Sequence, residues 1–126
     1  ISHKDLCTLK PDFTIEKSIN QMVKLKKSEG YLIDGDEKLL NKFELHQLIS
    51  EKNKNKKISK LHQLKFLKLY SESNIFESIE KSKDFVGESI PIVTKQNKMF
   101  GIISEGDLFQ IFLKVTREEK ELENKD

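Results

Sequence analysis

Hydrophobic positions recur along this chain with a period of 60 residues. When the sequence is compared with itself at that offset, without a gap, apolar residues coincide with apolar residues from Leu9 to Ile49 and again from Leu69 to Phe109. Few of the paired positions are identical, so the repeat is visible in the class of residue rather than in its identity. Self-similarity at a fixed offset is typical of a duplicated structural unit, and we predict two copies of one motif.

Each copy contains, in order, an extended segment, an amphipathic helix, two strands around a polar turn and a closing helix. In the first copy these elements are predicted at residues 6–9, 15–26, 31–33, 39–43 and 45–51. In the second copy the strands are predicted at 66–69, 91–93 and 99–103, the first helix carries Ile75, Phe76 and Ile79, and the closing helix runs from 105 onward. Neither copy has enough elements to cover its own sheet. We therefore expect an α/β (α+β) fold in which two β-α-β-β-α motifs pack sheet to sheet with pseudo-two-fold symmetry.

The domain boundaries follow from this repeat and from two highly charged segments. Residues 1–51 form the first copy and residues 61–113 the second. Between them, residues 52–60 are rich in lysine and are expected to be a solvated linker. Residues 114–126 form a charged C-terminal tail, which is expected to be a frayed helix or a contact for a partner.

Composition places the chain among globular proteins and excludes several functional classes. The chain has 126 residues, of which 36% are hydrophobic and 35% charged, enough for a modest core under a charged surface. Its formal charge of +2 gives no overall field that favours nucleic acid or an anionic membrane. The single cysteine, Cys7, cannot form an intrachain disulfide, which is typical of a reducing intracellular setting. No apolar run approaches the roughly 20 residues of a membrane helix.

The second copy contains a segment that resembles a known family. Residues 101–108, with the sequence GIISEGDL, are similar to the closing signature of a CBS motif. Residues 90–93, with the sequence IPIV, are similar to the apolar strand that precedes this signature. The resemblance covers nearly the whole chain and implies a tandem CBS pair, often called a Bateman module. It also implies that adenosine-containing ligands, with AMP, ADP and ATP as candidates, bind in the cleft between the motifs as regulators rather than as cofactors.

Ser104 and Asp107 are polar residues of that signature, and their positions have a physical reason. Ser104 lies where a strand gives way to a helix, so its hydroxyl and the free N–H groups of the helix can receive a phosphate. Asp107 lies about one helical turn further on the same side, where a carboxylate can accept hydrogen bonds from both ribose hydroxyls. Gly101 lets the backbone approach another group closely. The structural alternative is that Ser104 and Asp107 are an ordinary helix cap with an acid in the first turn.

Apolar residues from both copies are predicted to complete the nucleotide site. Ile90 and Pro91 offer an apolar wall for a flat base. Tyr31 and Leu9 can line the cleft from the first copy, although for Tyr31 we prefer a core aromatic whose hydroxyl lies at the rim. The predicted nucleotide-binding residues are Leu9, Tyr31, Ile90, Pro91, Gly101, Ile103, Ser104 and Asp107.

The first copy departs from the signature at each of these positions. The residues that stand where the second copy has Pro91, Gly101, Ser104 and Asp107 are Tyr31, Asn41, Glu44 and Gln47. A carboxylate at Glu44 repels a phosphate, and the Gln47 amide matches a ribose diol less well than a carboxylate does. The pseudo-site of the first copy is therefore expected to be empty or structural, with at most one nucleotide bound per chain.

Residues 84–109 and the charged C-terminus also resemble the cytoplasmic C-terminal domain of bacterial chloride channels of the ClC family. This resemblance implies a regulatory module at the cytoplasmic face of a membrane, attached to a membrane-embedded channel domain that precedes Ile1. CBS pairs also occur in magnesium transporters, metabolic enzymes and kinase subunits, and as free-standing proteins, and these parents remain alternatives. A module that serves for dimerisation and binds no ligand is a further alternative.

A homodimer is expected to form through the helical faces of the pair, about a two-fold axis. Phe85, Phe109 and Phe112 are the candidate dimer residues, and core packing is their alternative role, above all for Phe109. A ligand would act by shifting the equilibrium between two arrangements of the motifs.

Other constellations in the sequence give weaker hypotheses. The set His3, His46, His62 and Cys7 lacks the spacing of metal ligands, so no metal site is predicted. The sequence shows no activated nucleophile and no glycine-rich phosphate loop, so the chain is not predicted to be an enzyme. The lysines of residues 52–60 can contact the phosphates of nucleic acid or lipid, but no aromatic residues for base stacking lie among them. A linker is the preferred interpretation, and no nucleic-acid partner is expected.

Overall fold

The structure, a computed structural model, describes residues 6–62, 65–85 and 89–123. The first copy contains β1 (Thr8–Leu9), α1 (Ile15–Leu25), β2 (Glu29–Ile33), β3 (Leu39–Glu44) and α2 (Leu45–Ile49). A short 3-10 helix, η1 (Ile58–Lys60), comes before the second copy. The second copy contains β4 (Leu69–Tyr70), α3 (Ile75–Ser82), β5 (Ser89–Val93), β6 (Met99–Ser104) and α4 (Glu105–Glu123). The predicted order of elements, β-α-β-β-α in each copy, is confirmed.

Each copy forms its own three-stranded sheet, and the two sheets have the same topology. The strand order is β1-β2-β3 in the first sheet and β4-β5-β6 in the second. In both, the first pair of strands is parallel and the second pair is antiparallel. The register repeats as well, because Leu9 pairs with Leu32 in the first sheet and Leu69 pairs with Ile92 in the second. The predicted α+β fold of two duplicated motifs is therefore confirmed.

A β-bulge occurs at the same place in both copies and decides which side chains face the other sheet. The strand pairing skips Leu40 in β3 and Phe100 in β6, which are 60 residues apart. An extra residue reverses the alternation of side chains along a strand. Leu39 and Lys42, although three residues apart, therefore both face the second copy.

Helix α1 covers the outer face of the first sheet. Its N-terminus is capped by the Thr14 side chain, and Lys26 ends it in the left-handed conformation, with a φ of 57°. Apolar residues of α1, α2 and the first sheet form one buried core. Gly30 lies where a Cβ atom would be 2.7 Å from Leu9 Cδ1 and 3.3 Å from Met22 Sδ. The close packing of α1 on the sheet therefore depends on a glycine at this position.

The two sheets face each other across a pseudo-two-fold axis near the turns of their hairpins. Leu39 N donates to Asn97 O at 3.0 Å, and Met99 N donates to Glu37 O at 2.9 Å, so the two bonds are related by the 60-residue offset. Glu37 and Asn97 both have a positive φ, 66° and 65° respectively. The buried residues of the cluster between the sheets are Tyr31, Leu39 and Val93. The sheet-to-sheet packing expected from the repeat is thus present.

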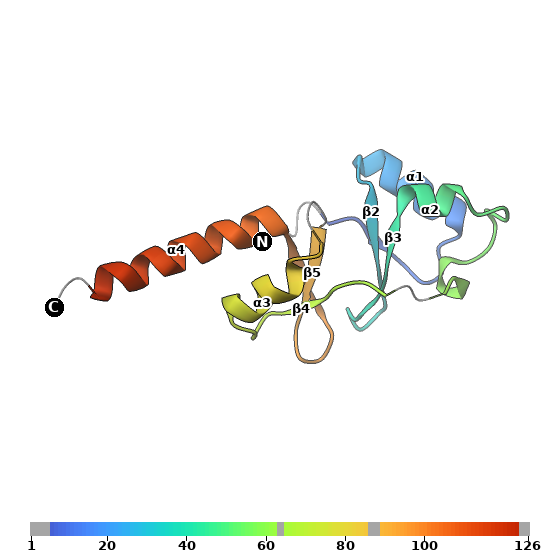
Figure 1. Ribbon diagram of the computed structural model, residues 1–126. Helices are drawn as coiled ribbons and strands as arrows, with labels where there is room; N and C mark the ends of the chain where they lie inside the picture. Colours follow the sequence, from blue (N-terminus) through green and yellow to red (C-terminus); the bar gives the residue numbers. More distant parts are fainter. Residues whose placement is uncertain (1–5, 63–64, 86–88, 124–126) are drawn as a thin grey trace.

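Figure 1 shows the resulting layers. Helices α1 and α2 lie on the outer side of the first sheet, and α3 and the start of α4 lie on the outer side of the second, with the two sheets between them. The rest of α4 extends away from the body of the molecule. In the described ranges, no helix is long and apolar enough to span a membrane.

The lysine-rich segment 52–60 runs along the N-terminus of α1. Ile15 N donates to Lys56 O and Ile58 N donates to Phe13 O, both at 2.9 Å. Ile58 is fully buried in the core of the first copy. The exposed lysines of the segment are Lys52, Lys56, Lys57 and Lys60. Its lysine side chains are therefore mostly solvated, while its backbone is fastened to the first copy.

Candidate functional site at the junction of the two copies

Ser104 and Asp107 lie together where β6 meets α4. Ser104 is the last residue of β6, and its Oγ accepts a hydrogen bond from Asp107 N at 3.0 Å. This bond caps the helix, which is the structural role that the sequence also allows for Ser104. Asp107 is exposed, so its carboxylate is accessible to a ligand.

Leu9, Ile90 and Ile103 lie in the cores of the two copies. Their exposed fractions are 0%, 1% and 5%. Leu9 packs with residues of α1 and α2, whereas Ile90 and Ile103 pack with residues of α3 and α4. The sequence-based prediction placed these side chains along a ligand cleft, and the structure places them on the helix-covered faces of the sheets.

Tyr31 and Pro91 occupy equivalent positions in the repeat, and both are buried. Tyr31 lies in the cluster between the sheets, and its hydroxyl donates to Glu29 Oε2 at 3.2 Å. It is a core aromatic with a bonded hydroxyl, as in the interpretation preferred above. Gly101 pairs with Ile92 in the second sheet, directly after the bulge.

A pocket of about 350 Å³ opens at the junction of the two copies. Its lining consists of Lys42 and Glu44 from β3, His46 and Gln47 from α2, and Lys65, Phe66 and Phe85 from the second copy. Glu44 and Gln47 are the counterparts of Ser104 and Asp107 in the repeat. The pocket therefore lies at the pseudo-site of the first copy, which we expected to be empty or structural.

The lining of this pocket suits an anionic ligand with a flat apolar part. Among the described lining residues, Lys42, Lys65 and His46 are basic and Glu44 is acidic. His46 Nε2 lies 3.1 Å from Glu44 Oε2, so the two side chains contact each other in the pocket wall. Two phenylalanine rings supply apolar surface. The pocket combines the cationic and apolar groups that ligand sites commonly use.

Glu44 and Gln47 also help to start α2. Glu44 N donates to Gln47 Oε1 at 3.4 Å, and the two residues form a capping box. The residues that replace the CBS-type signature in the first copy therefore have a structural role as well as a place in the pocket wall.

Lys42 connects the pocket to the contact between the copies. Its Nζ donates to Ser89 O of β5 at 2.8 Å and lies 3.5 Å from Glu29 Oε2. The Tyr31 hydroxyl donates to the same oxygen of Glu29. The exposed fraction is 8% for the Lys42 side chain and 20% for that of Glu29. These groups form a largely buried polar cluster at the junction.

Sequence reasoning missed Lys42 and Glu29 as functional candidates. The available signal was a lysine in a predicted strand, at a position where the repeat has Ile102. That signal does not reveal a partner, because Glu29 and Ser89 come close to Lys42 through the pairing of strands and the packing of sheets.

The described residues offer no metal centre and no activated nucleophile. In those ranges, no three side chains of His, Cys, Asp or Glu lie close enough together to hold a metal ion. His3, which was considered as a metal ligand, lies outside the described residues. Burial raises the pKa of the Cys7 thiol, and Lys27 opposes this shift more weakly. A raised pKa keeps the thiol neutral and unreactive at neutral pH.

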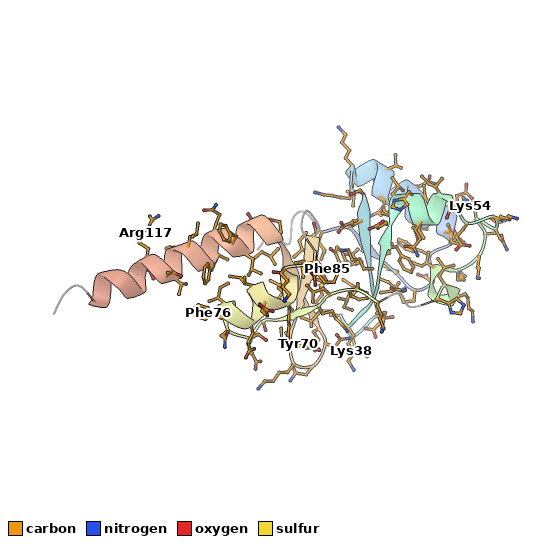
Figure 2. All side chains as sticks on the ribbon, viewed as in Figure 1. Lys38, Lys54, Tyr70, Phe76, Phe85 and Arg117 are labelled. Carbon is orange, nitrogen blue, oxygen red and sulfur yellow. The ribbon has the colours of Figure 1, made fainter. Side chains whose placement is uncertain are left out.

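The three phenylalanines predicted at a dimer surface have different surroundings. Phe85 packs against the core of the second copy and lines the pocket, near the middle of the molecule in Figure 2. Phe109 is 48% exposed and stacks on Phe112, with 6.4 Å between ring centroids. Phe76, half exposed on α3, meets the Phe112 ring edge-on at 5.6 Å. An exposed apolar patch on α3 and α4 therefore exists, and Phe85 lies apart from it.

Comparison with known proteins finds this architecture among solved structures. No protein-family model matches the sequence, and no curated protein matches it. The structure is similar to a CBS domain pair/ACT domain protein from Thermotoga maritima, with a TM-score of 0.71, 13% identity and coverage of 89% of this chain and 92% of that one. It is also similar to the CBS-pair protein CBSX2 from Arabidopsis thaliana, with a TM-score of 0.68, 19% identity and coverage of 91% of each chain.

A third similar structure is the cytosolic domain of the Mg²⁺ channel MgtE in complex with ATP. The TM-score is 0.73 and the identity 14%, with coverage of 86% of this chain and 45% of that one. At such identities the likeness concerns the fold, and it agrees with the duplicated topology and the sheet-to-sheet packing described above. This chain therefore has the fold of a tandem CBS domain pair.

Proposed function

We propose that this chain is a regulatory module that binds an adenine nucleotide at the junction of its two copies. The observation that carries the proposal is the fold, in which two copies pack about a pseudo-two-fold axis and which is similar to that of a solved CBS domain pair. One similar structure is in complex with ATP. The module acts by coupling rather than by chemistry, because a ligand that prefers one arrangement of the copies shifts their equilibrium toward it.

Asp107 and Ser104 are the proposed anchors of the nucleotide. The exposed carboxylate of Asp107 accepts hydrogen bonds from the ribose hydroxyls, and the phosphate lies toward Ser104 and Gly101. Support comes from the bond between Ser104 Oγ and Asp107 N, which holds the two residues in one turn. Tyr31 and Pro91 shape the junction beside them, since both are buried at equivalent positions of the two sheets.

The pocket lined by Lys42, Lys65 and His46 is a second candidate location for the ligand. It is favoured by its volume of about 350 Å³ and by its cationic and aromatic lining. Asp107 does not line this pocket. A ligand in the pocket therefore does not need Asp107, whereas a ligand at the first location does.

We also propose that the module regulates a membrane transport protein to which it is attached, with a ClC-type chloride channel as the specific candidate. The similarity to the cytosolic domain of a Mg²⁺ channel supports a transport protein, and the resemblance of residues 84–109 supports the ClC family. The module then lies at the cytoplasmic face of the membrane. Regulation of another transporter or of a metabolic enzyme is the alternative. Membrane helices encoded upstream of Ile1 would favour a transport protein over a metabolic enzyme.

A homodimer is the proposed assembly. Phe76 on α3 and Phe109 on α4 are about half exposed, and both rings contact the Phe112 ring. An exposed apolar patch of this kind is typical of a surface that is covered in an assembly. A two-fold axis would place the patch of one chain against the same patch of a second chain.

The test of the nucleotide proposal is a thermal unfolding series with adenosine, AMP, ADP, ATP and S-adenosylmethionine. A ligand that binds the native state raises the melting temperature by an amount that grows with its concentration. We expect at least one nucleotide to raise it, and Asp107→Ala to remove most of the increase. If no compound changes the melting temperature at millimolar concentration, the module does not bind these ligands.

A matched control separates nucleotide binding from a general attraction of phosphates to the basic segment 52–60. The triple change of Lys54, Lys56 and Lys57 to Gln removes positive charge from that segment, and Asp107 stays in place. The nucleotide effect is expected to survive this change. An effect that disappears with the lysines and survives Asp107→Ala would favour a phosphate-binding surface for nucleic acid or lipid.

A further inference from the structure

Lys42 and Glu29 form a largely buried charged pair at the junction of the copies. Lys42 Nζ lies 3.5 Å from Glu29 Oε2 and donates across the junction to Ser89 O at 2.8 Å. Burying two charges costs free energy even when they are paired, and apolar residues of similar size often serve the fold equally well. The pair therefore calls for a reason other than stability.

The internal repeat shows what the fold needs at this place. The counterparts of Lys42 and Glu29 in the second copy are Ile102 and Ser89. Ile102 packs in the cluster between the sheets. An apolar residue is thus compatible with the position, so packing alone does not require the charge of Lys42. Departures from such local rules concentrate at functional sites.

Lys42 also forms part of the pocket wall, together with Lys65 and His46. Glu29 lies outside that wall. Lys42 thus lines the pocket, and its ammonium group also lies beside the carboxylate of Glu29. An anion in the pocket would compete with Glu29 for the ion pair with Lys42 and with Ser89 O for its hydrogen bond.

We propose that the pocket binds a phosphate group through Lys42 and Lys65, and that binding draws Lys42 away from Glu29 and Ser89. A bound phosphate then weakens the hydrogen bond between Lys42 of the first copy and Ser89 of the second. In this way ligand binding changes how the two copies are arranged. The inference rests on the proposed function in one respect, namely that a ligand binds at the junction of the two copies. It does not require that the ligand binds at Asp107. Because coupling between two interactions is reciprocal, any change that releases Lys42 from Glu29 raises the affinity for phosphate.

Glu29→Gln is the decisive variant. It keeps the size of the side chain and an oxygen acceptor but removes the charge that competes for Lys42. We expect it to bind pyrophosphate and ATP about five- to tenfold more tightly than the wild type does, at the low end of the usual range of such couplings. Lys42→Met and Lys65→Met are expected to weaken binding at least about tenfold. Glu80→Gln and Lys60→Met, at exposed positions outside the pocket, are the matched controls and should leave the affinity unchanged.

The binding is measured by nuclear magnetic resonance at constant ionic strength. The His46 ring reports occupancy, because it lines the pocket. The carbonyl carbon of Ser89 reports the contact between copies, because its oxygen accepts the hydrogen bond from Lys42. In the wild type, pyrophosphate should shift both signals with one saturation curve, and in Lys42→Met the Ser89 signal should no longer respond. The wild-type titration tests the inference even if a variant fails to fold.

The outcomes separate this inference from the proposed function. The inference fails if pyrophosphate and ATP leave His46 unchanged, if Ser89 does not respond while His46 does, or if Glu29→Gln binds no more tightly than the wild type. When ATP still raises the melting temperature through Asp107 in such a case, the proposed function stands alone. A second outcome is that pyrophosphate shifts both the His46 and the Ser89 signals, while Asp107→Ala leaves the rise in melting temperature with nucleotide unchanged. The coupling through Lys42 is then supported, and the nucleotide site at Asp107 is excluded.

Discussion

Single residues in this protein serve the fold and the proposed site at once, and Ser104 is an example. Ser104→Ala removes the oxygen that accepts from Asp107 N, so we expect the free energy of unfolding to fall by about 1 kcal/mol. Ser104→Asp restores an acceptor and a favourable charge at the helix start, but it repels a phosphate. Urea denaturation should therefore rank Ser104→Asp close to the wild type. Equal stabilisation of this variant and the wild type by ATP would contradict a phosphate contact at Ser104.

Cys7 gives a prediction about pH. Burial raises the pKa of its thiol, so the folded state favours the neutral form more strongly than the unfolded state does. The contribution to stability is complete below the ordinary thiol pKa of about 8.5 and is lost as the pH rises through the raised value. In urea denaturation between about pH 8 and pH 10, the free energy of unfolding should fall more steeply for the wild type than for Cys7→Ala. Parallel pH profiles would show that the thiol makes no such contribution.

Among the elements, the packing of α1 on the first sheet depends on the space at Gly30. A Cβ atom there would lie 2.7 Å from Leu9 Cδ1, inside a core in which Leu9 is fully buried. Gly30→Ala is expected to lower the free energy of unfolding by about 1–3 kcal/mol through overpacking. Gly35→Ala is the control, because a Cβ atom at Gly35 meets nothing within 4 Å. Similar denaturation midpoints for the two variants would mean that the core accommodates the extra methyl group.

The two hairpin turns make a second prediction about elements. Glu37 and Asn97 share a left-handed backbone conformation, which costs glutamate more than asparagine. Glu37→Gly relieves this cost and should stabilise the protein by up to about 1 kcal/mol. Asn97→Ala keeps the unfavourable φ and loses the bond from Asn97 Nδ2 to Leu39 O, so it should destabilise by about 1–2 kcal/mol. Thermal unfolding measures both, and a shift of both variants in one direction would refute the argument.

For the molecule as a whole, the exposed patch on α3 and α4 predicts association. Phe109→Glu puts a charge into the proposed dimer contact and should convert a dimer into a monomer in sedimentation velocity. Val23→Glu, at a residue of α1 that is 58% exposed, is the control and should leave the assembly intact. A monomeric wild type at high micromolar concentration, or disruption by both variants, would exclude this dimer.

The order of elements could be predicted from the sequence because helices and strands have different apolar periods. The ends of elements were less certain, since they depend on caps and tertiary contacts. Helix α2, for example, ends at Ile49, whereas the sequence predicts a helix to about residue 51. The bulges at Leu40 and Phe100 were not predicted, because an extra residue in a strand leaves no clear mark on an apolar pattern.

The candidate site could be predicted less completely than the fold. The signature at Ser104 and Asp107 is contiguous, so the sequence alone places both residues at one helix start, and the structure agrees. Leu9 and Ile90 were assigned to a cleft, but they lie in the cores. An apolar residue on a strand faces either the helices or the other sheet, and the sequence pattern does not say which.

By itself, the sequence determined that the chain is a duplication, which elements each copy contains, and that the two copies differ at the signature positions. Only the tertiary structure decided which residues of one copy come opposite those of the other. The pocket between Lys42 and Lys65, and the position of Lys42 between that pocket and Glu29, arise from the packing of two sheets and from a bulge that turns Lys42 toward the second copy. The physical reason is that periodicity fixes the apolar face of one element, whereas a site between two copies depends on the register and orientation in which their faces meet.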